Sequence, residues 1–428
     1  MKAQSIGHLW RKLEPGIVIL LLLVFSADVD LAPFLRTGVN IFAYVIIYPL
    51  VLGCWKRFLY VCTRDWTLLL LLVVALTSFF WSVAPEVTSL KLRALMRTMM
   101  IGGYLAARYT PLEQKQLLSK VLILSGFFSY AAVLLLPSYG IKFASADGDL
   151  GWTGIYGFKN GLGTMMNLGA TLALLNFLHG KKNRLLSLVG FCLAVILIVC
   201  SKSSTSLISL ASAIALLPIY KIMKQHYKLR IVFFISALLL SVSVAILALT
   251  NLDTIFTNFL GKEATLSGRQ PLWGAIVSVG NERPWLGYGF GGAFWNSPFG
   301  LEAISRNPLG WPPLDSDLTK FHSHSGFVEL FTQLGWLGCS IFALNFVFVF
   351  YRVITLAIST KKIEYFWMLQ ILIIFVVFNY TEAPTILVAN QFMWVLYVSI
   401  CLSTAIQKGR IKRESQRRNF QKINCPVG

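Results

Sequence analysis

The sequence predicts an all-α polytopic membrane protein with about twelve transmembrane helices and one large loop that contains short helices. Two observations carry this prediction. The 428 residues are 56% hydrophobic and only 13% charged, with a mean hydropathy of +0.68, whereas about 25% of residues are charged in a soluble domain. The apolar residues form continuous runs rather than alternating with polar ones, which favours membrane helices over barrel strands.

Twelve apolar stretches are close to the length of a membrane span. They cover approximately residues 15–32, 37–54, 66–82, 93–108, 117–137, 158–178, 185–201, 204–220, 230–250, 326–351, 363–380 and 387–406. The first stretch follows Arg11 and Lys12, but no clear small-residue cleavage site follows it. We therefore expect an uncleaved first helix rather than a signal peptide.

The basic residues predict the orientation. They concentrate in the even-numbered connections and in the tail, whereas the stretch 251–326 has six acids and five bases. The positive-inside rule then puts both termini in the cytoplasm and the long loop outside. The expected organisation is a membrane bundle over 1–250, the outer loop 251–326, a second bundle part over 327–406 and a basic cytoplasmic tail 407–428.

This distribution also explains the net charge of +20 without a nucleic-acid partner. Membrane lipids are the expected surroundings. The tail is either a solvated positive-inside segment, which we favour, or a segment that binds anionic lipid heads.

The long loop is expected to contain a short amphipathic helix over Ser267–Gly280, with Ser267 as its N-cap. Leu272, Ile276 and Val279 recur on one face. Arg269 would stand in the first turn, where the helix dipole and free N–H groups favour an anion.

Glycines follow this helix. Gly287 and Gly289, with Gly291 and Gly292, predict a flexible, close-packing turn. A nucleotide-binding loop is disfavoured, because no strand precedes the glycines and the loop lies outside the cytoplasm.

Several other cations map to the outer side, where the positive-inside rule does not explain them. Arg93 and Arg97 lie four apart on one helix face, Lys159 precedes Asn160, and Lys202 lies among hydroxyl residues that include Ser204. A diphosphate at the outer leaflet would explain this set. Snorkelling to lipid heads remains an equal alternative for the two arginines.

His322 and His324 end the loop just before the tenth span. A histidine near several outer cations can act as a base near neutral pH, although a lone histidine is more often structural. A metal site with Asp315 and Asp317 is a weak alternative, because the H-x-H pattern is common. The seven cysteines show no C-x-x-C spacing and none lies in the long loop, so we predict no metal or other cofactor.

These motifs resemble the O-antigen ligase and Wzy-type polysaccharide polymerase superfamily, especially its ExoQ-like exopolysaccharide polymerase branch. The matching segments are Gly157–Gly163, Ser201–Leu207, Leu266–Arg269, Pro284–Gly291, His324–Phe327 and Leu334–Gly338. Each is short, and their order and spacing carry the resemblance.

The resemblance implies a membrane glycosyltransferase of the bacterial inner membrane with a periplasmic active site. Its donor is a glycan on undecaprenyl diphosphate. His324 matches the residue thought to be the general base, and Arg269 matches the residue thought to hold the diphosphate. Ser204 stands where ligases carry another Arg, and Ser325 stands where the family more often has Asn. These departures leave the second phosphate contact open.

The acceptor distinguishes the possible activities. A polymerase adds the glycan to another lipid-linked repeat unit. We favour this activity because the segment Ser89–Arg108 resembles the ExoQ-like branch. A ligase adds it to lipid A-core or to a protein hydroxyl. A transporter of the lipid-linked sugar would have charges along a path through the bundle. The cations here are expected on the outer face only, which disfavours a transporter. Chain-length regulator and flippase proteins are candidate partners.

Overall fold

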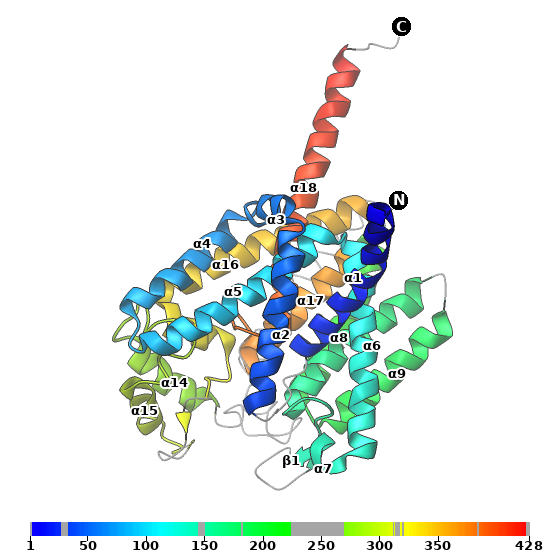
Figure 1. Ribbon diagram of the computed structural model, residues 1–428. Coiled ribbons are helices and arrows are strands. Elements are labelled where there is room, and N and C mark those ends of the chain that lie inside the picture. Colours follow the sequence, from blue (N-terminus) through cyan, green and yellow to red (C-terminus); the bar gives the residue numbers. More distant parts are fainter. Residues whose placement is uncertain are drawn as a thin grey trace.

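The computed structural model describes residues 2–26, 33–143, 150–180, 183–223, 269–310, 312, 317–318, 321–382 and 385–424. These residues form a bundle of helices with one two-stranded antiparallel hairpin (Figure 1). The helices of the first half are α1 (Lys2–Ser26), α2 (Pro33–Leu52), α3 (Trp55–Cys62), α4 (Trp66–Thr77), α5 (Pro85–Arg108), α6 (Pro111–Leu135), α7 (Pro137–Gly140) and α8 (Lys159–His179).

Later in the chain the helices are α9 (Arg184–Cys200), α10 (Ser204–Ala215), α11 (Leu217–Met223), α14 (Arg269–Gly280), α15 (Pro298–Ser305), α16 (Gly326–Thr360), α17 (Ile363–Thr381) and α18 (Phe392–Asn424). The 3-10 turn η1 (Ser78–Trp81) follows α4, and β1 (Ile141–Phe143) pairs with β2 (Leu150–Trp152).

The all-α membrane class is confirmed. Six helices are long and apolar enough to cross a membrane, or up to seven if the bent pair 41–52 and 55–62 is one span, counted over the described residues. Each predicted span except the ninth overlaps helical residues in the described part of the chain. The ninth, 230–250, and the loop segment 251–268 with Ser267 lie outside the described residues. The count of twelve therefore stays a prediction.

The start of α1 and the end of α18 lie at the same end of the bundle, whereas α14 and α15 lie at the opposite end (Figure 1). This arrangement agrees with the predicted sidedness. Which end faces the cytoplasm stays a prediction. Helix α18 continues through the basic tail to Asn424, a helical extension that the composition of the tail did not indicate.

Local sequence signals explain several helix starts. Asp65 caps α4 by accepting a hydrogen bond from the Leu68 amide. Thr110 and Glu113 form a reciprocal capping box at the start of α6, with Pro111 in its first turn. Both devices satisfy amides that have no partner within the helix.

The tenth predicted span, 326–351, differs from the structure. Helix α16 runs to Thr360 but is broken at Gly335, where φ is +61°. The amides of Trp336 and Leu337 donate to the carbonyls of Pro284 and Trp285 at 2.7 and 3.1 Å. The freed backbone groups of the break are therefore paired with the glycine-rich loop, as a break in a membrane helix requires.

The expected amphipathic helix is present as α14, whose described part begins at Arg269; Ser267 and Gly268 lie outside the described residues. Leu272, Ile276 and Val279 are fully buried, and they pack with Tyr288 and Trp295 in a small apolar core separate from that of the bundle. Helices α14 and α15 thus form a compact cap at one end of the bundle.

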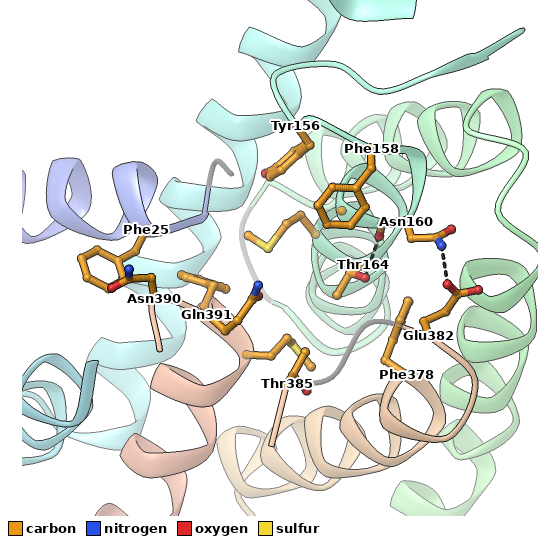
Figure 2. Close-up of a pocket in the computed structure, with 14 residues that line it drawn as sticks. Phe25, Tyr156, Phe158, Asn160, Thr164, Phe378, Glu382, Thr385, Asn390 and Gln391 are labelled. Carbon is orange, nitrogen blue, oxygen red and sulfur yellow. Dashed lines mark hydrogen bonds between the residues drawn. The ribbon is translucent and has the colours of Figure 1, made fainter. Parts of the chain in front are cut away.

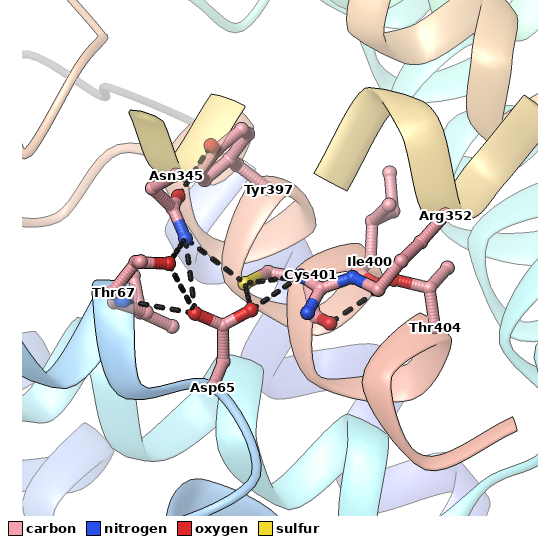
Figure 3. A network of polar contacts seen from close by, with 9 residues as sticks. Asp65, Thr67, Asn345, Arg352, Tyr397, Ile400, Cys401 and Thr404 are labelled. Atoms are coloured by element: carbon pink, nitrogen blue, oxygen red, sulfur yellow. Dashed lines mark hydrogen bonds and ion pairs between the residues drawn. The ribbon is translucent and has the colours of Figure 1, made fainter. Parts of the chain in front are cut away.

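At the other end, a buried polar network joins α4, α16 and α18 (Figure 3). Asp65 pairs with Arg352 and accepts from Thr67 at 2.7 Å and from Asn345 at 3.1 Å. Tyr397 in turn donates to Asn345 at 2.6 Å. Satisfied hydrogen bonds offset the cost of burying the Asp65 charge.

Candidate functional site

A buried carboxylate, Glu382, is the centre of the candidate site. It directly follows α17 and is 6% exposed. Thr205 donates to it at 2.7 Å, Asn160 donates to its other oxygen, and Arg269 forms an ion pair with it at 3.4 Å. Segments that are distant in sequence therefore converge on one side chain.

The three partners of Glu382 all lie at the beginnings of helices. Asn160 is the second residue of α8, Thr205 the second of α10 and Arg269 the first of α14. Helix N-termini carry partial positive charge and unpaired N–H groups. These helix ends therefore favour negative charge, both on Glu382 and on an anionic ligand.

The turn that carries the two histidines is anchored on both sides. The Trp273 indole of α14 donates to the Ser323 carbonyl at 2.7 Å, and the Ser325 hydroxyl donates to the Asn379 carbonyl of α17 at 3.3 Å. The carboxylate of Glu329 also accepts from the Ser323 amide at 3.0 Å. The same end of α17 therefore supports both this turn and Glu382.

His324 has a left-handed backbone, with φ of +53°. Residues other than glycine rarely adopt this conformation, and strain of this kind clusters at functional sites. The backbone amide of His324 donates to Nδ1 of His322 at 3.1 Å, and the centres of the two rings lie 4.3 Å apart. This contact requires that His322 be unprotonated at Nδ1.

Burial, the neighbouring His322 and the charge of Arg269 lower the pKa of His324 to about 3. Burial also lowers the pKa of His322. The charge of Glu329 raises this pKa, and the charge of Arg269 lowers it. Both imidazoles are therefore neutral near pH 7, and His324 can accept a proton. The effect of Arg269 on both rings shows that the guanidinium and the histidine turn lie in one electrostatic environment.

The structure thus brings Arg269, Asn160, His322 and His324 into one region. Lys159 adjoins Asn160, and Ser204 adjoins Thr205. Lys202 is exposed in the turn between α9 and α10 with φ of +54°. The connection between these two helices is a tight turn.

Arg93 and Arg97, expected on one face, have different environments. Arg93 is exposed, and its Nε donates to the Ser89 carbonyl at 3.4 Å. Arg97 is 2% exposed, donates to Asn390 Oδ1 at 2.6 Å and lies 4.4 Å from the ring centre of Tyr44. Arg97 therefore does not snorkel to lipid heads.

The glycine turn is close-packed, as predicted. Gly287 and Gly289 have φ of +67° and +110°. A Cβ at Gly287 would lie 2.7 Å from the Thr332 carbonyl oxygen, and one at Gly289 would collide with Ser82. These glycines dock the outer loop onto α16 and onto the segment before α5.

Metal ligation finds no support in the geometry. Within the described ranges, no group of three or more His, Cys, Asp or Glu side chains is arranged to hold a metal ion. Asp315, one of the alternative ligands, lies outside the described residues.

A pocket opens beside Glu382, with about 600 Å³ of empty space including solvent at its mouth. Figure 2 shows Asn160, Glu382 and Phe158 at one end of it and Phe25 and Asn390 at the other. Since Arg97 holds Asn390, the pocket extends from the Glu382 cluster to the surroundings of Arg97.

Comparison with known proteins gives two matches. Residues 188–343 match the family model of O-antigen ligase. The chain is also 27% identical, over 73% of its length and 71% of the relative, to the exopolysaccharide production protein ExoQ of Rhizobium meliloti (strain 1021). Both matches support a membrane polysaccharide polymerase or ligase of the O-antigen ligase type.

The range that matches the O-antigen ligase model contains Arg269, Thr205 and both histidines, whereas Asn160 and Glu382 lie outside it. Sequence reasoning missed Glu382. The available signal was a lone acidic residue directly after a long apolar span, since such residues are costly at the edge of a membrane and are often functional.

Proposed function

We propose that this protein polymerises undecaprenyl-diphosphate-linked oligosaccharide repeat units into exopolysaccharide or O-antigen at the periplasmic face of the bacterial inner membrane. The proposal rests on Arg269, which is paired with Glu382, and on the histidine turn, which is anchored to α14 and to the end of α17 and whose histidine pKa values Arg269 lowers. Together they supply a cation and a proton acceptor, which transfer from a diphosphate requires.

In the proposed reaction, a hydroxyl oxygen of the acceptor sugar forms a bond to the anomeric carbon of the donor. The bond from that carbon to the diphosphate oxygen breaks, and the diphosphate leaves with the electron pair. His324 takes the hydroxyl proton. A single displacement of this kind inverts the configuration at the anomeric carbon, and it needs neither a metal nor a nucleotide sugar.

Arg269 is suited to hold the leaving group. Its side chain is 22% exposed, and its guanidinium lies 3.4 Å from Glu382. This distance is longer than the about 2.7–2.9 Å of a strong charge-assisted contact. Glu382 therefore orients the guanidinium without engaging it closely. Lys202, Lys159, Arg93 and Arg97 remain candidates for further contacts to the diphosphate or to other charged parts of the substrate.

The charge of the donor also bears on the base. A diphosphate beside Arg269 would offset the positive charge that helps to lower the pKa of His324 to about 3. The pKa of His324 would then rise, and the imidazole would become a better base once the donor is bound.

The family match to O-antigen ligase favours one alternative, transfer of the finished glycan to lipid A-core or to a protein hydroxyl. Deleting the gene and analysing extracted polysaccharide on a gel distinguishes the two activities. A polymerase deletion leaves single repeat units attached to lipid A-core, whereas a ligase deletion accumulates full-length lipid-linked polymer. Wild-type polysaccharide in the deletion strain would contradict both.

The orientation proposed for this mechanism has both termini in the cytoplasm and the cap of α14 and α15 in the periplasm. A reporter fused at about residue 300 tests it, since 300 lies in α15. Activity of a periplasm-specific reporter is expected. Activity of a cytoplasm-specific reporter at this position would overturn the mechanism.

A further inference from the structure

The pocket beside Glu382 has an unusual combination of walls. Aromatic rings of Phe25, Phe158 and Phe378 line it together with the carboxamides of Asn160, Asn390 and Gln391. Aromatic faces pack on the apolar face of a ring, and carboxamides both donate to and accept from hydroxyl groups. A hydroxylated ring with an apolar face would match both the aromatic side chains and the carboxamides of these walls.

Two carboxamides have hydrogen-bonding capacity that the protein does not use. Within the described part of the chain, Oδ1 of Asn160 is buried without a hydrogen-bond partner. Its amide nitrogen donates to Glu382, which fixes the direction in which Oδ1 points. Gln391 is half-buried, and its side chain makes no hydrogen bond to the described residues. An unpaired buried oxygen costs free energy unless a ligand hydroxyl or water satisfies it.

The opposite end of the pocket is rigid. The side-chain oxygen of Asn390 accepts from Arg97 at 2.6 Å, and the backbone N–H of Asn390 donates to the Thr98 hydroxyl at 2.9 Å. Phe158, at the Glu382 end, is 38% exposed (Figure 2). The pocket therefore has an end that is fixed by hydrogen bonds at Asn390 and an exposed aromatic ring at the other end.

We infer that this pocket binds a single sugar ring at the reacting end of the glycan, with Phe158 against the face of the ring and with Asn160 and Gln391 bonded to its hydroxyls. This inference rests on the proposed function and deepens it. The ring belongs either to the sugar next to the donor diphosphate or to the acceptor sugar, since the proposed reaction joins these two.

Binding to the purified full-length protein in nanodiscs tests this assignment with three probes. The first is the oligosaccharide released by mild acid from the lipid-linked pool of the source cells. The second is that lipid-linked pool itself, and the third is undecaprenyl diphosphate without sugar. Phe158→Ala is expected to weaken sugar binding about tenfold, and Gln391→Leu about threefold to tenfold. Phe127→Ala is the control, because Phe127 is 66% exposed on α6 and does not line the pocket.

The pattern of loss identifies the ring. Weaker binding of the released oligosaccharide assigns the acceptor sugar, and weaker binding of the lipid-linked glycan alone assigns the donor sugar. Unchanged binding of both sugar probes by the two variants overturns the inference. Weaker binding of undecaprenyl diphosphate overturns it too, because the pocket would then hold the lipid diphosphate.

Arg269→Ala separates this result from the proposed function. It should weaken both probes that carry a diphosphate and leave the released oligosaccharide unaffected. If Arg269→Ala changes none of the three while Phe158→Ala still weakens sugar binding, the assigned role of Arg269 fails and the sugar pocket stands.

Discussion

Two buried carboxylates, Asp65 and Glu382, join distant helices at opposite ends of this protein, yet their surroundings differ. Asp65 is enclosed by Arg352, Thr67 and Asn345 and does not line the pocket beside Glu382 (Figure 3). Glu382 instead lines that pocket (Figure 2). Its ion pair with Arg269 is 3.4 Å long.

The difference indicates what each carboxylate does. A closed network of this kind fixes the packing of helices, because both oxygens of the Asp65 carboxylate have partners within the protein. An open one keeps a partly exposed cation and an unpaired amide oxygen beside a pocket, which favours ligand binding over stability. We therefore assign packing to Asp65 and chemistry to Glu382, and substitutions at both ends test this contrast.

The largest effect on activity is expected at His324. Removing a general base lowers the rate by about 10²–10⁴-fold. His324→Asn is the preferred variant, because Asn tolerates the left-handed backbone that Ala would strain. Polymer formation measured per amount of membrane-inserted protein should fall in this range, and normal protein levels are expected. Full activity would remove His324 from the mechanism, and His322→Asn, which should lose less, is the matched control.

The next largest effect is expected at Arg269. Loss of a donor to the developing negative charge costs about 10²–10³-fold, so Arg269→Ala should abolish visible polymer. Arg269→Lys keeps the charge but not the forked geometry, and it should retain part of the activity. Titration of turnover against lipid-linked donor measures both variants. A wild-type rate for Arg269→Ala would contradict its role.

Glu382→Gln should have an intermediate effect. The single amide oxygen can still accept from Asn160, and the Thr205 hydroxyl can turn to accept from the new NH2 group, but the charge that pairs with Arg269 is lost. We expect an activity loss of about tenfold or more, since small misplacements of catalytic groups are costly, with a small change in thermal stability. A large fall in Tm with unchanged activity per folded molecule would give Glu382 the role that we assign to Asp65.

Asp65→Asn should show the reverse. Breaking a buried ion pair costs about 3–5 kcal/mol, because Arg352 stays buried without its counter-ion. Thermal unfolding followed by fluorescence-detected size exclusion should show a clear fall in Tm. Activity per folded molecule should stay at the wild-type level, and its loss would show that the closed network also serves the reaction.

The smallest effect is expected from chelation. EDTA should not change the rate, because the proposed mechanism places no metal beside either carboxylate. Turnover of the purified protein before and after chelation measures this. Inhibition that a divalent cation reverses would restore the metal alternative at the histidine turn.

Local patterns in the sequence predicted much of this fold. Apolar length located the helices, and the spacing of Leu272, Ile276 and Val279 predicted the buried face of α14, which is confirmed. The turn at Lys202 and the close packing of Gly287 also follow from local composition. In each case the physical cause lies within a few residues of the feature.

Features that depend on distant partners could not be predicted in the same way. The break of α16 at Gly335 requires the backbone of Pro284 and Trp285, about fifty residues earlier. The burial of Arg97 depends on Asn390, which is almost three hundred residues away. Glu382 likewise gains its partners only when the ends of four helices meet, so neither hydropathy nor spacing could indicate its place in the site.

Reconstitution tests the central claim most directly. Purified protein in detergent would be given lipid-linked repeat units as both donor and acceptor, without nucleotide sugar or added metal, and the products separated by length. The account predicts a ladder of longer lipid-linked glycans that His324→Asn abolishes and Asp65→Asn retains per folded molecule. No lengthening by active wild-type protein, or lengthening that persists in His324→Asn, would contradict it.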